Sequence, residues 1–225
     1  MTTASPAPPV RLVLASRSPA RLALLRAAGV EPIVRVSDVD EDAVVRSLGP
    51  GVAHTSVVTE LAAAKAEVVA ETVAAEPDLA VGTVVIVGCD SMLSIGGSLV
   101  GKPHDVDTAR DRWSVMAGSA GELLTGHCVL RLDDGRITAR AARHSGTVVR
   151  FGTPGPDDLE AYLASGEPLA VAGAFTLDGL GGWFVDGIDG DPSSVVGLGL
   201  PLVRRLLAEV NVTVSALWAG RGLAT

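Results

Sequence analysis

One hydrophobic stretch carries two residues that could do chemistry together, Asp90 and Lys102. Four β-branched apolar residues at 84–87 predict a buried strand that ends at Gly88 and presents Asp90 at its carboxyl end. A glycine turn at 96–97 predicts a hairpin that can bring Lys102 back towards the carboxylate. Because an acid beside a buried strand rarely serves packing, the pattern predicts a cleft shared by a carboxylate and an ammonium group.

A second candidate site lies near the N-terminus, where a predicted strand at 10–15 runs into Ser16 and a polar turn. Pro19 suits the first turn of a helix that ends at Gly29. A helix that starts just after a strand directs free N–H groups and the positive end of its dipole at an anion. Ser16 and Arg21 would add a hydroxyl and a forked cation. A serine before a proline is also an ordinary helix cap, so this pattern alone leaves both interpretations open.

Acidic residues gather at 37–42, a run that includes Glu41. Such a run is commonly a solvated loop, and the alternative is a site for a hard cation. Residues 43–54 predict a loop that can be mobile. The alanine-rich stretch at 55–75 predicts a long helix, on which Lys65 alone would be interpreted as a surface residue.

The second half of the chain predicts fewer helices and more hairpins. A helix is expected up to Met116, and an antiparallel hairpin at 122–151. His127 lies in its first strand and is interpreted as packed or hydrogen-bonded rather than catalytic. The glycine-rich section at 165–192 predicts tight turns and part of a ligand-binding wall. A last helix should begin at Ser193-Ser194, with a kink or restart at a proline.

These elements predict a mixed α/β protein with two lobes around a central cleft, which the 16–21 turn and the 165–192 section would line. The 225 residues allow one domain or two closely packed lobes. No apolar run approaches the roughly 18 to 20 residues of a membrane span, and we expect no membrane partner. The first nine residues predict a disordered tail without signal-peptide features, so a cytoplasmic protein is expected.

Charge and cysteine content argue against nucleic-acid binding and against a structural zinc site or disulfide framework. The formal charge of −8 is unfavourable for nucleic-acid binding, which needs a basic face to neutralise phosphates. Cys89 and Cys128 lie far apart and have no C-x-x-C partner, which argues against a structural zinc site or a disulfide framework. An anionic ligand would therefore need a local cluster of cations.

Short motifs follow one another in a fixed order along the chain. They are Leu14-Ala15-Ser16, Ser18-Pro19, Arg21, Asp40-Glu41, Lys65-Ala66, Gly88-Cys89-Asp90-Ser91, Gly101-Lys102-Pro103, Gly118, Thr125-Gly126, Ser165-Gly166-Glu167, Ala172-Gly173-Ala174-Phe175, the 188–191 turn and Val195-Val196-Gly197-Leu198. Their order and spacing resemble the Maf family of nucleoside triphosphate pyrophosphatases over essentially the whole chain after residue 10.

The resemblance implies an elongated, two-lobed fold of the inosine-triphosphate-pyrophosphatase type, formed by a single catalytic domain at 10–225. It implies hydrolysis of a nucleoside triphosphate between its α and β phosphates, with a divalent cation, Mg²⁺ or Mn²⁺. Members of the family are cytoplasmic and often dimeric, so a homodimer is expected. They are linked both to the removal of non-standard nucleotides and to inhibition of septum formation.

Carried over by position, the resemblance makes Asp90 the proton acceptor and Glu41 a metal-associated acid. Both are hard oxygen ligands suited to Mg²⁺. The groups that would hold the triphosphate are Ser16, Arg21, Lys65 and Lys102. Their positive charges would stabilise the charge that builds on a departing pyrophosphate.

Three positions depart from the usual family pattern and are candidates for base specificity. Ala20 stands where the family has the first of two arginines, and Ser91 stands where a threonine follows the aspartate. Asp178 appears in the glycine-rich section where a glutamine is frequent. The reaction type is therefore better defined by the pattern than the preferred base.

Two other hypotheses about the function remain open from the sequence. The protein could be a nucleotide-binding regulator of cell division whose catalysis is secondary or lost. It could also be a phosphatase or sugar-phosphate enzyme, which would release orthophosphate instead of pyrophosphate.

Overall fold

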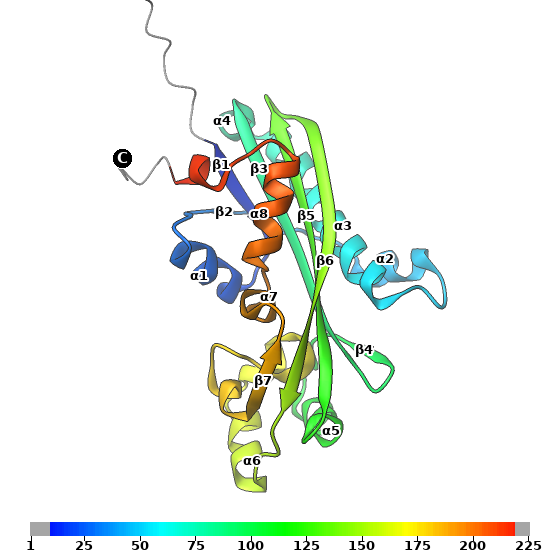
Figure 1. Ribbon diagram of the computed structural model, residues 1–225. Coiled ribbons are helices and arrows are strands. Elements are labelled where there is room, and N and C mark those ends of the chain that lie inside the picture. The colour runs from blue at the N-terminus through cyan, green and yellow to red at the C-terminus, as the bar shows by residue number, and fades with distance from the viewer. Residues whose placement is uncertain (1–9, 219–225) are drawn as a thin grey trace, which may run out of the picture.

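A mixed β-sheet forms the centre of the protein in the computed structural model (Figure 1). The structure describes residues 10–218, so the predicted tail at 1–9 lies outside the described residues. Within them, seven strands are arranged in the order β2-β1-β3-β5-β6-β7, and β4 also pairs with β3. The strands are β1 Arg11–Ala15, β2 Ile33–Val34, β3 Thr83–Ile95, β4 Ser98–Val100, β5 Ala120–Asp133, β6 Arg136–Phe151 and β7 Val185–Asp189.

Helices cover the sheet and connect its strands. The α-helices are α1 Pro19–Ala27, α2 Glu41–Leu48, α3 His54–Ala75, α4 Pro77–Ala80, α5 Val106–Met116, α6 Pro156–Ala164, α7 Pro192–Val196 and α8 Leu200–Glu209. Four short 3₁₀ turns complete the described chain: η1 Glu167–Ala170, η2 Ala172–Ala174, η3 Leu180–Phe184 and η4 Val214–Leu217. No helix among residues 10–218 is both long and apolar enough to cross a bilayer.

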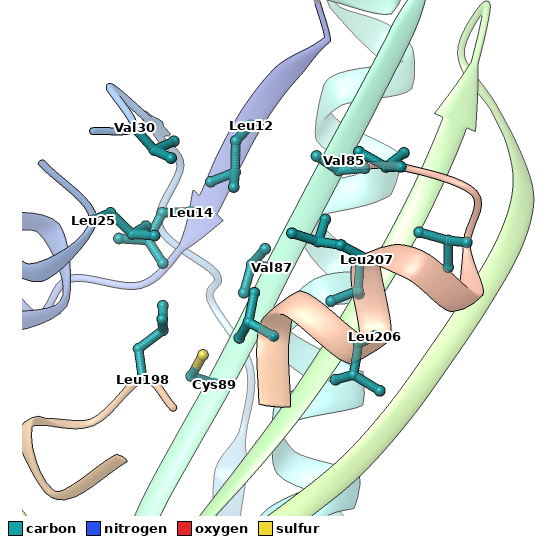
Figure 2. Close-up of a cluster of buried hydrophobic side chains, with 14 of the residues drawn as sticks. Leu12, Leu14, Leu25, Val30, Val85, Val87, Cys89, Leu198, Leu206 and Leu207 are labelled. Carbon is teal, nitrogen blue, oxygen red and sulfur yellow. The ribbon is translucent and has the colours of Figure 1, made fainter. Parts of the chain in front are cut away.

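The first half of β3 is buried on both faces because successive side chains alternate between two helical layers. Val84 and Ile86 pack in the cluster that contains the alanines and valines of α3. Val85, Val87 and Cys89 pack on the other face with leucines from α1 and α8, and Figure 2 shows α8 in front of the sheet and α3 behind it. The run of β-branched residues is therefore explained by burial on both sides.

A second core surrounds the other end of the long strands and forms the second lobe. Trp113 of α5 is fully buried there, and its ring meets those of Phe151, Tyr162 and Phe184 edge to face. Leu93 brings β3 into this cluster. Since β3, β5 and β6 run through both cores, the predicted mixed α/β class and its two lobes are confirmed (Figure 1).

Several boundaries differ from the sequence prediction. The buried strand does not end at Gly88 but continues to Ile95, so Asp90 lies inside β3. The predicted loop after the acidic run is in large part the helix α2. The apolar pattern at 33–36 predicts a strand, of which the structure forms only the two residues of β2.

The last helix also differs in how it begins. Asp191, not Ser193-Ser194, caps the segment, and the helix restarts at Leu200 with Pro201 in its first turn, as the proline predicts. The segment after Asn211 ends in the 3₁₀ turn η4.

Two glycines set the distance between α3 and the sheet. A Cβ atom at Gly88 would lie 2.3 Å from the carbonyl oxygen of Ala62, and one at Gly126 would lie 2.0 Å from that of Val58. Gly126 lies opposite Asp90 in the β3–β5 ladder. The backbone of α3 therefore touches the sheet next to Asp90, and no residue with a side chain could take either position without moving the helix.

We expect Gly126→Ala to destabilise the protein by roughly 3 kcal/mol or more, because the added methyl group meets helix backbone that cannot move aside by side-chain rotation. Urea unfolding followed by circular dichroism would measure the loss. Gly155→Ala is the matched control, since a Cβ there has its nearest neighbour at 3.7 Å. Equal stability of the two variants would contradict this account of the α3 contact.

Candidate active site

The candidate site lies at a gap in one edge of the sheet. Along this edge of β3, the ladder with β1 ends at Ala15↔Gly88, and the ladder with β4 begins at Leu93↔Val100. Among the described strands, none pairs with residues 89–92 on this side, while β5 pairs with them on the other. The gap also lies at the carboxyl end of the parallel strand β1, the position at which open α/β sheets bind ligands.

Lys65 joins two carboxylates at this gap. Its Nζ lies 2.5 Å from Oδ1 of Asp90 and 2.8 Å from Oε1 of Glu41. The side chains of Lys65 and Asp90 are 13% and 10% exposed, whereas that of Glu41 is 55% exposed. The three residues come from α3, β3 and α2, so the prediction that Lys65 is more than a surface residue agrees with its position.

Burial raises the pKa of the Asp90 carboxyl above its ordinary value. The positive charges of Lys65 and, to a smaller extent, Arg21 act in the opposite direction and favour the ionised form. Burial is the larger effect. Asp90 is thus a carboxylate with more affinity for a proton than an exposed aspartate, next to a cation that keeps it in place.

The acidic run is divided between structural and site roles. Asp40 caps α2 by accepting a hydrogen bond from the Ala43 N–H at 2.8 Å, which explains why a helix begins here. Glu41 follows in the first turn and reaches Lys65. Asp38 is almost fully exposed and forms an ion pair with Arg17, also exposed, at 3.3 Å. The solvated-loop interpretation therefore holds for part of the run only.

Arg21 fastens the turn between β1 and α1 to β3. Its guanidinium donates to the carbonyl oxygens of Cys89 at 2.8 Å and Gly197 at 2.7 Å, and to the hydroxyls of Ser16 and Ser91. Most of its N–H groups are therefore engaged within the protein. Ser16 also accepts from the N–H of Ser18, the residue that caps α1. The serine-proline motif is thus both a helix cap and part of the site.

Hydroxyl groups continue this network across the sheet. Ser91 Oγ lies 3.1 Å from Thr125 Oγ1, which donates to the carbonyl oxygen of Ser194 at 2.9 Å. Ser194 Oγ in turn meets Thr147 Oγ1 at 2.9 Å. Asp90 points towards α3, whereas its neighbour Ser91 points towards α1 and α7, as alternation along a strand requires. The two residues therefore serve different faces of the sheet.

The remaining predicted residues are less tightly held. Lys102 is exposed and follows β4, and the ion pair of Asp90 is formed with Lys65. Ala20 lies in the first turn of α1. Asp178 is exposed on the turn before η3. The neighbouring Glu167 holds that turn by accepting from the N–H groups of Leu180 and Gly181.

Sequence reasoning missed several groups that build the site. The carbonyl oxygen of Gly197 accepts from Arg21, and the hydroxyl of Thr125 meets that of Ser91. Neither residue has a side chain that would by itself mark it as part of a site. The two glycines against α3, Gly88 and Gly126, could have been found, since each stands in a motif with a site residue.

His127 is confirmed as a packed histidine. It is fully buried, and its Nε2 accepts the backbone N–H of Gly199 at 2.8 Å. Burial and, secondarily, the charge of Arg21 lower the pKa of His127 to about 3. The ring is therefore neutral at physiological pH and supports the segment between α7 and α8.

Comparison with known proteins adds an independent result. The family model described as "Maf-like protein" matches residues 11–210. The chain is 65% identical over 210 residues to a protein of Rhodococcus jostii (strain RHA1) named nucleoside triphosphate pyrophosphatase, covering 93% of this chain and 97% of that protein. A protein of the same name from Nocardia farcinica is 62% identical over 207 residues, which cover 92% of this chain and 96% of that protein. Another, from Mycobacterium marinum, is 54% identical over 213 residues, which cover 95% of this chain and 99% of that protein.

The buried His127 predicts a loss of stability in acid. Between pH 6.5, the ordinary histidine pKa, and about 3, its value in the folded protein, the unfolded state binds one more proton than the folded state. The stabilising contribution is therefore complete above pH 6.5 and falls by up to about 1.4 kcal/mol per pH unit below it. Urea unfolding at pH 7.0, 6.0 and 5.0 would measure the slope.

His127→Gln keeps an acceptor for Gly199 and should flatten this part of the profile. His144→Gln, at an exposed position of β6, is the control and should keep the slope of the unaltered protein. A profile that His127→Gln leaves unchanged would contradict the assignment.

Proposed function

This chain belongs to the Maf family, and on that premise we propose that it is a nucleoside triphosphate pyrophosphatase. The substrate would be cleaved between its α and β phosphates to a nucleoside monophosphate and pyrophosphate. The observation that carries the proposal is the buried Asp90, held by Lys65 beside Glu41 at the gap in the sheet edge. A binding module would not need a buried proton acceptor at this place.

The charges around the gap suit a phosphoanhydride. Arg21 and the N-terminal end of α1 lie on one side of residues 89–92, and Lys65 lies on the other. Positive groups placed at the phosphate chain stabilise the charge that builds on the leaving pyrophosphate. Ser16 and Arg21 would orient the phosphates, and Lys65 and Lys102 would contribute point charges.

Asp90 would act as the proton acceptor for the attacking water. Its raised pKa brings it closer to the operating pH than an exposed aspartate, which improves proton transfer. Lys65 holds the carboxylate in a fixed orientation, so the accepting oxygen would be placed before the substrate arrives.

The donor set fits a divalent cation that binds together with the substrate. Two carboxylates and one ammonium leave the cluster of Glu41, Asp90 and Lys65 with a charge of −1, which would repel a triphosphate on its own. The described residues contain no group of three or more His, Cys, Asp or Glu side chains placed for a metal. Mg²⁺ commonly takes one or two carboxylates, with phosphate and water as further ligands. Glu41 and Asp90 would hold Mg²⁺ or Mn²⁺, which would supply positive charge at the phosphate oxygens.

The residues that set the base preference stay a prediction. Ser91 is engaged by Arg21 and Thr125, so a change at this position would act partly through the placement of Arg21. Ala20 and Asp178 also stay candidates. A homodimer and a cytoplasmic location likewise stay predictions from the family resemblance.

We expect Asp90→Asn to lower the rate of pyrophosphate release by about a hundredfold to ten-thousandfold, because the amide cannot accept the proton of the attacking water. A panel of nucleoside triphosphates with Mg²⁺, analysed for pyrophosphate, orthophosphate and monophosphate, would measure it. Asp111→Asn, at an exposed position of α5, is the control. Release of orthophosphate alone would favour a phosphatase, and full activity of Asp90→Asn would refute the role of this residue.

The metal proposal predicts a separate effect at Glu41. Glu41→Gln removes one anionic oxygen ligand and should raise the Mg²⁺ concentration for half-maximal activity by about tenfold or more. Asp42→Asn, the neighbouring exposed acid of the same helix turn, should leave it unchanged. Activity that persists unchanged in excess chelator would refute the requirement for a metal.

A further inference from the structure

Lys102 is placed by the main chain rather than by contacts of its own side chain. In the described part of the chain its ammonium group has neither a hydrogen-bond nor an ion-pair partner. The β3–β4 ladder ends at Leu93↔Val100, and its register, if continued, would place Lys102 opposite Ser91, the neighbour of Asp90. A Cβ built at Gly101 would lie 3.5 Å from the Met92 side chain, so the segment stays next to β3 after the ladder ends.

Arg112 of α5, in the second lobe, donates hydrogen bonds to the main chain of the segment at 101–102. Its guanidinium donates to the carbonyl oxygen of Gly101 and, at 3.4 Å, to that of Lys102. Gly101 O also accepts the N–H of Gly173 at 3.1 Å. One planar, forked side chain thus holds the peptide groups before and after Lys102, so the Cα atom that carries the lysine side chain lies between two held groups.

The environment of Arg112 is unusual for a charged residue. Burial lowers the pKa of Arg112, and the negative charge of Asp105 acts in the opposite direction with a smaller effect. No ion pair of Arg112 occurs within residues 10–218. Arg110, two positions earlier on α5, instead pairs with Asp107 and Glu160 at the surface. A partly buried guanidinium that is used only on main-chain oxygens indicates that the position of that main chain matters.

We propose that Arg112 is a positioning residue that fixes Lys102 for the phosphate chain of the substrate. This inference rests on the proposed function. The long, flexible stem of lysine makes its ammonium group depend on where the Cα atom is held. Without Arg112, the main chain at 101–104 would still be held, among residues 10–218, by the hydrogen bonds from Gly173 N to Gly101 O and from His104 N to Leu169 O. The lysine would then sample more positions and bind phosphate more weakly.

The test is a double-mutant cycle with Arg112→Met and Lys102→Ala. Methionine keeps the apolar stem of Arg112 and removes its donors. The measured quantity is the Kd for a nucleoside triphosphate analogue with a methylene bridge between the α and β phosphorus atoms, in Mg²⁺, together with KM and kcat for pyrophosphate release. Arg110→Met on the same helix is the control, and thermal unfolding of every variant monitors the fold.

We expect Arg112→Met to raise Kd and KM by about tenfold, with a smaller change in kcat. Arg112→Lys can reach one carbonyl only, so its Kd and KM should lie between those of Arg112→Met and of the unaltered protein. In the Lys102→Ala background Arg112→Met should change Kd by less than about twofold, because the lysine that Arg112 positions is absent. An equal multiplication of Kd in both backgrounds, or no change in either, would overturn the proposal.

The two proposals fail in different ways. If the unaltered protein binds the analogue but releases no pyrophosphate, the pyrophosphatase assignment fails and the Kd cycle still decides the role of Arg112. If it binds no nucleoside triphosphate, both proposals are overturned.

Discussion

The close contact between α3 and the sheet at Gly88 and Gly126 is the constraint on which the rest of the site depends. A helix normally lies about a side chain's length above a sheet, and here its backbone reaches the strands directly. That contact brings Lys65 to within hydrogen-bonding distance of Asp90 and keeps both largely out of water. Charges that are taken out of water are costly unless they are paired, so the helix, the lysine and the acid depend on one another.

The same contact explains why the site lies between the lobes. The apolar clusters of the first lobe end at Cys89 on β3, and that of the second begins at Leu93. Residues 90–92 lie between two cores, at an edge where neither β1 nor β4 pairs with them. Polar side chains from both lobes can therefore reach this short segment, which a continuous core or a continuous ladder would have closed.

The sequence could name the candidate site residues, but it could not show most of the groups that they contact. Asp90 is conspicuous as an acid beside a buried apolar run, whereas Glu41 and Lys65 became candidates only through the order and spacing of the family motifs. The length of β3 was not predictable, since the buried run ends at Gly88 while the ladder with β5 continues to Ser94. The start of α2 at Glu41 was hidden because acids favour both a solvated loop and a helix N-terminus. Arg21 looks like a free cation until the carbonyls of Cys89 and Gly197 are placed around it.

Because side chains alternate along a strand, the two neighbouring residues Asp90 and Ser91 of β3 face opposite sides of the sheet. The buried carboxylate of Asp90 faces α3 and pairs with Lys65, whereas Ser91 faces α1 and α7 and accepts a hydrogen bond from Arg21. On a fully paired strand the two sets would be separated by the sheet. Here the edge at residues 89–92, which no described strand covers, would let a single extended ligand meet both sets, with the N-terminal end of α1 close to the same edge. A phosphate chain is long, narrow and charged along its length, and it can therefore contact groups on both faces where a compact anion would reach only one.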